Sequence, residues 1–222
     1  MEIIAKIHNG FTAKFAVPRQ SGLAKIESKI IFEPPFRDAD AVRGMEGFSH
    51  LWLIWGFSEI KKYEWKPTVR PPKLGGNKRM GVFATRSPFR PNNIGLSCVK
   101  IKNIEIDHKL GPIITVVGAD LINGTPIYDI KPYIPYSDSI PEAKGGFADE
   151  HYGKFLNVVF LEKTLNVLPK EVLPELKAIL EQDPRPAYHG NPERIYSFEY
   201  YNYRIKFNVK GNNLTVTEVI AI

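Results

Sequence analysis

The chain has 222 residues, enough for one large domain or for one domain with a smaller addition. Its hydrophobic content of 43% and charged content of 24% are typical of a folded globular protein and exclude a disordered one. The formal net charge of +6 is compatible with a polyanionic partner.

Cysteine usage and hydropathy indicate the cellular compartment of the protein. The single cysteine, Cys98, excludes an internal disulfide bond and a multi-cysteine zinc site, so we expect a reducing compartment and no metal. No apolar run approaches the roughly 20 residues of a membrane span. The first residues, Met1–His8, lack the apolar core of a secretory signal. We therefore expect a cytoplasmic protein with no membrane contact.

Patterns typical of β-strands dominate residues 1–140. We expect strands at Ile3–His8, Leu23–Phe32, Phe48–Phe57, Met80–Thr85, Ile94–Ile106 and Ile113–Leu121, and a single helical turn at Ala39–Met45. The run from Ile113 to Asp120 is apolar at both parities, so we expect that strand to be covered on both faces. Because no long helix separates these strands, the pattern favours an antiparallel β-barrel over a wound parallel sheet.

A composition change separates a second region from the first. Ser137–Gly153 contains proline, glycine and alternating charges, which is typical of a linker. Beyond it we expect a strand, a helix and two strands joined by the hairpin turn Lys210–Asn213, at Phe155–Leu161, Lys170–Gln182, Tyr196–Val209 and Leu214–Ile222. The prediction is a mainly β protein, with a barrel in residues 1–140 and a smaller C-terminal α+β domain in residues 150–222.

The run from Arg79 to Ser97 contains the densest group of polar side chains. Arg86 and Arg90 lie in a loop with Pro88 and Pro91, and proline reduces the entropy lost when a loop is ordered. Guanidinium groups match carboxylates and phosphates through paired hydrogen bonds. Two interpretations are open, a rigid surface loop paired to nearby acids and an anion-binding site on a β-scaffold.

Two further segments are candidates for ligand contact. After the tight turn at Asn123–Pro126, Asp129, Lys131 and Tyr133 alternate along an extended segment, so all three are expected on one face. The loop Arg70–Arg79 contains four basic residues that suit nucleic-acid phosphates, although a solvated basic loop explains them as well. The chain has no Gly-rich dinucleotide fingerprint and no Walker loop.

Several of these segments, in order along the chain, resemble the TsaA-like family, which includes the TrmO tRNA methyltransferases. The matching segments are Phe15–Gln20, Ala39–Gly44, Phe48–Trp52, Pro67–Pro72, Gly81–Ser87, Asp129–Tyr133 and Gln182–Tyr188. The resemblance implies a β-barrel that binds S-adenosylmethionine, a homodimer, and a smaller C-terminal domain. It also implies a tRNA partner and methylation of the exocyclic amine of the threonylcarbamoyl-modified adenosine 3′ of the anticodon.

The resemblance also implies roles for particular residues. The cofactor-binding residues would be Pro18, Arg19, Gln20, Arg86, Leu96, Gly124, Thr125, Pro126 and Ile127, and by spacing alone Ser58 and Glu59. Lys131, Tyr133 and Arg90 would orient the modified base or its carboxylate-bearing side chain. The amine proton would pass to Asp129 or to water. Positioning of the amine against the methyl donor would supply much of the rate.

Two other functions compete with a tRNA methyltransferase. One is a non-catalytic regulatory module that binds S-adenosylmethionine or RNA, and the other is a methyltransferase acting on a small molecule. The basic loop Arg70–Arg79 and the aromatic and basic residues of Tyr196–Lys206 favour an RNA partner over a small molecule.

Overall fold

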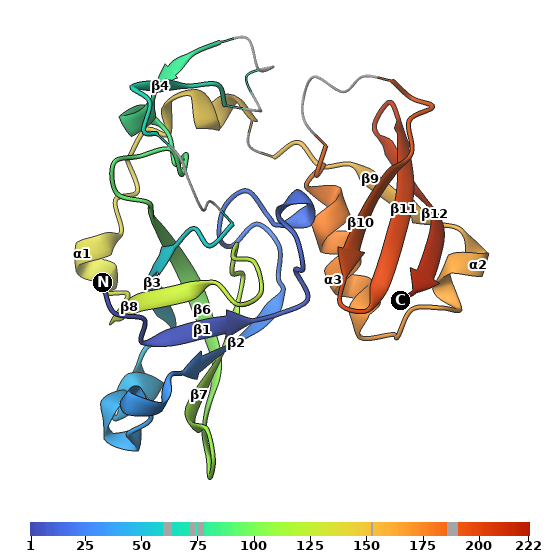
Figure 1. Cartoon of the computed structure of the whole chain (residues 1–222). Helices are drawn as coiled ribbons and strands as arrows, with labels where there is room; N and C mark the ends of the chain where they lie inside the picture. Colours follow the sequence, from blue (N-terminus) through green and yellow to red (C-terminus); the bar gives the residue numbers. More distant parts are fainter. Residues whose placement is uncertain (60–63, 72–73, 75–77, 152, 186–190) are drawn as a thin grey trace.

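The protein is described by a computed structural model that covers residues 1–59, 64–71, 74, 78–151, 153–185 and 191–222 (Figure 1). Six strands close into an antiparallel barrel in the order β1-β2-β7-β6-β3-β8. They are β1 Ala5–His8, β2 Glu27–Phe32, β3 His50–Gly56, β6 Ile94–Asp107, β7 Gly111–Val117 and β8 Pro126–Pro132. The predicted fold class, a mainly β protein built on an antiparallel barrel, is confirmed.

Alternation of apolar residues along the strands fills the barrel. Leu51 and Leu53 of β3, Ile30 of β2 and Ile114 of β7 are fully buried in one core cluster. Every residue from Pro112 to Val116 is buried, so the prediction that this strand is covered on both faces is confirmed. The predicted helical turn is also present, as short 3-10 turns at Ala39–Val42 and Met45–Gly47, with a further one at Pro34–Phe36.

One predicted barrel strand is wrong. Met80–Thr85 contributes only β5, Met80–Gly81, which pairs with β4, Thr68–Val69, in a separate two-stranded sheet. The chain then forms a 3-10 turn at Val82–Ala84, in which Phe83 is 70% exposed. A short apolar run does not distinguish a strand from a turn by pattern alone. The sixth barrel strand is β8 instead.

The C-terminal region forms a four-stranded sheet with helices. Its order is β10-β11-β12-β9, with β9 parallel to β12 and the other pairs antiparallel. The elements are β9 Asn157–Phe160, α2 Glu162–Leu165, α3 Val172–Glu181, β10 Tyr196–Tyr200, β11 Tyr203–Lys210 and β12 Asn213–Ala221. The predicted strand Tyr196–Val209 is therefore two strands, because the chain reverses at Tyr201, whose φ is 50°. The hairpin turn after Lys210 is confirmed.

The C-terminal region shares its core with the connection between β1 and β2. α3 lies between the C-terminal sheet and the barrel (Figure 1), and its Leu176, Ile179 and Leu180 are buried against that sheet. The connection between β1 and β2, which contains a 3-10 turn at Lys14–Ala16, packs Phe11 and Ile26 into the same cluster. A segment of the barrel thus completes the C-terminal core.

The connection from β8 to β9 contains α1, Pro135–Asp138, and a 3-10 turn at Gly146–His151. Among the described residues no helix has the length and apolar character needed to cross a membrane.

Candidate functional site at the loop end of the barrel

Three connections leave the barrel at the same end, because neighbouring strands alternate in direction. They are residues 9–26 between β1 and β2, 57–93 between β3 and β6, and 118–125 between β7 and β8. We call this the loop end. Most of the predicted cofactor residues belong to these connections, and Leu96, Pro126 and Ile127 lie at the adjoining starts of β6 and β8. Barrel topology therefore gathers segments about 100 residues apart in sequence.

Two sets of side-chain hydrogen bonds lie at these connections, and the charge of Arg86 acts on Asp120 between them. Arg86 Nη1 donates to Gln20 Oε1 at 2.5 Å. Ser97 Oγ donates to Asp120 Oδ1 at 2.5 Å, and Trp55 Nε1 donates to Ser97 Oγ at 2.9 Å. The side chains are thus held in place by one another, which is the arrangement expected where a ligand is bound by preorganised groups.

Asp120 is the buried acid of this group. Burial raises the pKa of its carboxyl group, and the hydrogen bond from Ser97 and the positive charge of Arg86 oppose that rise. A carboxyl group with a perturbed pKa in a polar cluster is a marker of a functional site. The sequence placed Asp120 at the end of an apolar run but suggested no role for it. It suggested no role for Ser97 or Trp55 either.

Close backbone contacts bring the first and third connections together. Gly22 N donates to Gly118 O at 2.8 Å, and Gly118 N donates to Ile26 O at 2.9 Å. Gly118 has a φ of +91°, and a Cβ atom there would lie 3.2 Å from Gly22 Cα. Glycine is therefore required at residue 118 by both its backbone conformation and the approach of the neighbouring loop.

The predicted cofactor residues differ in the solvent exposure of their side chains. The side chains of Thr125 and Ile127 are buried in the protein, so these residues can offer a ligand little beyond backbone atoms. Leu96, by contrast, is 54% exposed on the outer surface of β6. Ser58 and Glu59 are exposed at the loop end, and Gly124 and Pro126 are half-buried.

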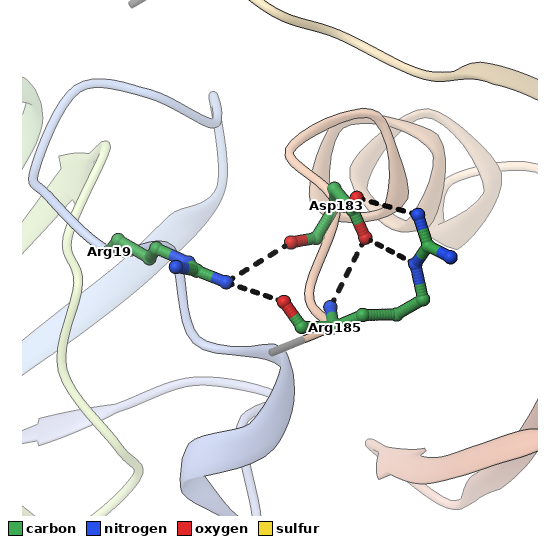
Figure 2. Close-up of polar contacts among 3 residues, drawn as sticks. All are labelled: Arg19, Asp183 and Arg185. Atoms are coloured by element: carbon green, nitrogen blue, oxygen red, sulfur yellow. Dashed lines mark hydrogen bonds and ion pairs between the residues drawn. The ribbon is translucent and has the colours of Figure 1, made fainter. Parts of the chain in front are cut away.

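Arg19 points away from its neighbour Gln20. Its guanidinium group extends to the C-terminal domain, where Nη2 donates to Arg185 O at 2.7 Å (Figure 2). Gln20, by contrast, accepts a hydrogen bond from Arg86. The segment Pro18–Gln20 therefore contacts the C-terminal domain through Arg19 and the loop end through Gln20.

Arg90 is engaged within its own loop. Its Nη1 donates to the carbonyl oxygens of Val82 and Thr85 at 3.1 and 2.7 Å, and its guanidinium group lies 5.4 Å from the centre of the Phe83 ring. These contacts shape the turn that precedes β6. The predicted role of Arg90 in orienting the substrate stays a prediction.

Asp129 and Lys131 lie on the outer face of β8, as their alternation predicts, and Tyr133 follows directly after its last residue. Lys131 Nζ is 3.0 Å from Asp129 Oδ2. The Tyr133 ring lies 5.9 Å from that of Trp52. Tyr133 is roughly 20 Å along the strand direction from Pro126. Within one chain, these side chains line a flank of the barrel that begins beside Leu96 and extends away from the loop end.

Parts of two predicted contact regions lie outside the described residues. In the basic loop this applies to Lys73, whereas Lys78 and Arg70 are exposed and Arg79 Nη1 donates to Thr68 Oγ1 at 3.0 Å. It also applies to residues 186–188 of the C-terminal motif. In the described part of the chain, no three His, Cys, Asp or Glu residues are arranged to hold a metal ion.

The fold and site define a class of protein: a closed antiparallel barrel with an interconnected polar loop end and an attached α+β domain. Comparison with known proteins gives the family. The family model for the tRNA-methyltransferase O N-terminal domain matches residues 6–139, and that for the TrmO C-terminal domain matches residues 155–222. The chain belongs to the tRNA-methyltransferase O family.

Individual relatives are similar over nearly the whole chain. The tRNA (adenine(37)-N6)-methyltransferase of Escherichia coli K12 is 43% identical over 218 residues, covering 94% of this chain and 92% of that protein. A Pseudomonas aeruginosa relative, whose name describes an S-adenosylmethionine-dependent methyltransferase, is 38% identical over 202 residues, covering 87% of this chain and 85% of its own. A crystal structure of TrmO superposes with a TM-score of 0.81 at 29% identity, covering 99% of this chain and 97% of that chain.

Proposed function

We propose that this protein transfers a methyl group from S-adenosylmethionine to N6 of adenosine 37 in tRNA. The observation that carries the proposal is the 43% identity to an Escherichia coli enzyme of that name across 94% of this chain. The similarity includes both domains, and the segments that form the loop end lie within it.

The chemistry of the loop end fits the cofactor. S-adenosylmethionine carries a carboxylate, an ammonium group, a sulfonium centre and an adenine ring, and when bound it supplies an electrophilic methyl group. The Arg86 guanidinium suits the carboxylate, and exposed Leu96 suits an apolar surface. Asn93 Oδ1 is buried with no hydrogen-bond partner among the described residues, so an acceptor for an N–H group is available next to Phe57.

The residues of the chain contribute mainly by binding and orientation. Arg86 and Gln20 hold the cofactor end, and the buried carboxyl group of Asp120 lies where the charge of Arg86 acts on it. Lys131 and Tyr133 orient the nucleotide along the flank of β8. The substrate amine needs no strong base before transfer, so its proton passes to Asp129 or to water. Most of the acceleration comes from placing the amine in line with the methyl group.

We also propose that the working form is a homodimer. Within one chain, Lys131 and Tyr133 extend away from the loop end, so a second copy is a route by which the two sets of residues meet. The outer face of β3, β6 and β8 carries exposed Leu96 and the half-buried rings of Trp52 and Tyr133, which suits a protein interface. Light scattering of the wild type and of Leu96→Glu tests this: the wild type is expected to have twice the mass of the chain, and a monomeric wild type contradicts it.

The substrate we propose is the threonylcarbamoyl-modified adenosine, whose carboxylate gives a physical reason for cationic side chains at the site. A charge-assisted contact to a carboxylate is worth about 1.5–3 kcal/mol, so losing one lowers the specificity constant at least roughly tenfold. Methyl transfer is measured on modified and unmodified tRNA of one sequence at fixed ionic strength. We expect the unmodified tRNA to be at least roughly tenfold poorer, and nearly inert if two contacts are lost.

The outcomes of these assays distinguish carboxylate recognition, methyltransferase activity and a regulatory role. Equal rates on both tRNAs contradict carboxylate recognition but leave the methyltransferase activity intact. Cofactor binding by calorimetry with no methylated nucleoside detected by mass spectrometry favours the regulatory module instead. Phosphate contacts from Arg70 and Lys78 predict that unmodified tRNA still binds in low salt and dissociates as salt is raised.

A further inference from the structure

The C-terminal domain holds the segment that carries Pro18–Gln20. Phe11, Ala16 and Ala24 are buried in the core cluster formed mainly by the C-terminal sheet and α3. Tyr201 N donates to Gly10 O at 2.9 Å, and Gln182 Nε2 donates to Leu23 O at 3.2 Å. Both ends of the segment are therefore fixed by the C-terminal domain.

Arg19 adds a polar contact at the middle of this segment. Its Nη2 donates to Arg185 O at 2.7 Å and lies 3.5 Å from Asp183 O (Figure 2). Burial lowers the pKa of Arg19, and the negative charge of Asp183 opposes this change. Arginine stays charged under such conditions. The contact is thus a charged donor directed at two carbonyl oxygens of one short loop.

The loop that accepts these hydrogen bonds is stabilised by contacts among its own residues. Asp183 has a φ of 48°, a left-handed conformation that residues other than glycine adopt infrequently. Its carboxylate accepts from Arg185 Nε at 2.8 Å and from Arg185 Nη2 at 2.9 Å. The Arg185 side chain is only 15% exposed. This bidentate pair stabilises the turn, and the turn directs both carbonyl groups towards Arg19 (Figure 2).

A continuous path then leads from this loop to the buried acid. Arg19 is bonded to residues 183–185, its neighbour Gln20 accepts from Arg86, and the charge of Arg86 acts on Asp120. We propose that Arg19 is a positioning residue that holds Gln20 and Arg86 in their cofactor-binding arrangement, so that the loop 183–185 of the C-terminal domain sets cofactor affinity. This inference rests on the proposed function, in which Gln20 and Arg86 bind S-adenosylmethionine.

The coupling has a reciprocal consequence. If the placement of residues 183–185 favours cofactor binding, then cofactor binding favours that placement by the same free energy. Bound S-adenosylmethionine therefore increases the protection of the loop 183–185 from amide hydrogen exchange. A residue that only joins the domains would stabilise the loop equally with and without the cofactor.

The test uses the full-length protein with Arg19→Ala, Arg19→Lys, Asp183→Ala and the double variant Arg19→Ala/Asp183→Ala. Calorimetry gives the Kd for S-adenosylmethionine, and steady-state kinetics on tRNA give KM for the cofactor and kcat. We expect Arg19→Ala to raise Kd and KM about tenfold, as expected for losing a charge-assisted hydrogen bond, with kcat changed less than about twofold. Arg19→Lys keeps the charge and recovers part of the affinity.

The double variant tests the path itself. Since Arg19 acts through the turn that Asp183 stabilises, we expect the double variant to bind the cofactor no more weakly than the weaker single variant. The matched control is Arg43→Ala, which removes an exposed arginine paired with Asp40 at a turn between β2 and β3, away from the loop end. Its Kd is expected to equal that of the wild type.

Three results overturn the inference. They are an unchanged Kd in Arg19→Ala, additive effects in the double variant, and loop protection that is independent of the cofactor. A lowered melting temperature with normal cofactor affinity would make Arg19 a structural contact only. Failure of the wild type to bind S-adenosylmethionine is a different result, because it contradicts the proposed function before any variant is compared.

Discussion

The loop end of the barrel and the flank of β8 both present polar side chains, but they are organised differently. At the loop end, Gln20, Arg86 and Asp120 come from three connections and are linked through one another, with Asp120 buried. On the flank, Lys131 pairs with Asp129 two residues away, and both side chains are substantially exposed. A ligand at the loop end thus binds side chains that are already held in place. A ligand on the flank must first break or rearrange the exposed Lys131–Asp129 ion pair.

Arg86→Ala is expected to have the largest effect, because it removes the cation at the centre of the loop end. Losing a charge-assisted ligand contact of about 1.5–3 kcal/mol lowers kcat/KM roughly ten- to a hundredfold. Arg86 bonds to Gln20 at an exposed position, so the melting temperature should change little. Methyl transfer per folded molecule and thermal unfolding are measured together. A lower melting temperature with normal turnover would give Arg86 a purely structural role.

Lys131→Ala tests whether the flank contributes to substrate binding. The Lys131–Asp129 pair is exposed, and pairs of this kind contribute about 0.2–1 kcal/mol to stability, so folding should be nearly unaffected. We expect roughly tenfold slower transfer to modified tRNA and a much smaller loss on unmodified tRNA. Lys29→Ala is the control, since Lys29 is a similarly exposed lysine on β2 that lies near a glutamate. Equal losses in the two variants would remove the flank from the site.

The sequence predicted the flank better than the loop end, for a physical reason. Side chains alternate along a strand, so Asp129, Lys131 and Tyr133 could be assigned to one face by counting. The meeting of Gln20 with Arg86 depends on barrel closure, which brings together residues 66 positions apart. No local pattern encodes that contact. Resemblance to the TsaA-like family supplied Gln20 and Arg86 but not Asp120.

Two other differences between the predicted and the observed structure also arise from tertiary contacts that no local pattern encodes. The apolar run at Met80 matched a barrel strand in composition, but the barrel closes with β8, and this run pairs with Thr68–Val69 instead. The apolar residues between β1 and β2 were assigned to the barrel by their position in the chain. Phe11 and Ile26 pack in the C-terminal core because the tertiary arrangement places them there.

Asp120→Asn is expected to have the smallest effect, because it keeps the shape of the buried side chain and replaces the titrating carboxyl group by an amide. Burial raises the pKa of Asp120 in the folded protein, so the folded state binds its proton more tightly than the unfolded state does. The stability that this provides is complete below the ordinary carboxyl pKa of about 3.9 and is lost as pH rises through the raised value. Asparagine does not titrate, so the variant should gain stability relative to the wild type across that window and keep a constant difference above it.

Asp107, an acid elsewhere on the barrel, is the control, because its pKa is shifted in the opposite direction. Asp107 lies at the turn between β6 and β7, where hydrogen bonds from the backbone N–H groups of Leu110 and Lys109 lower its pKa. Its contribution to stability is present above the ordinary carboxyl pKa and is lost as pH falls through the lowered value. Asp107→Asn should therefore lose stability relative to the wild type as pH rises. Melting temperatures of the three proteins across the acidic range measure both trends, and a profile for Asp120→Asn parallel to that of the wild type would mean that the charge at the loop end is not held in a buried setting.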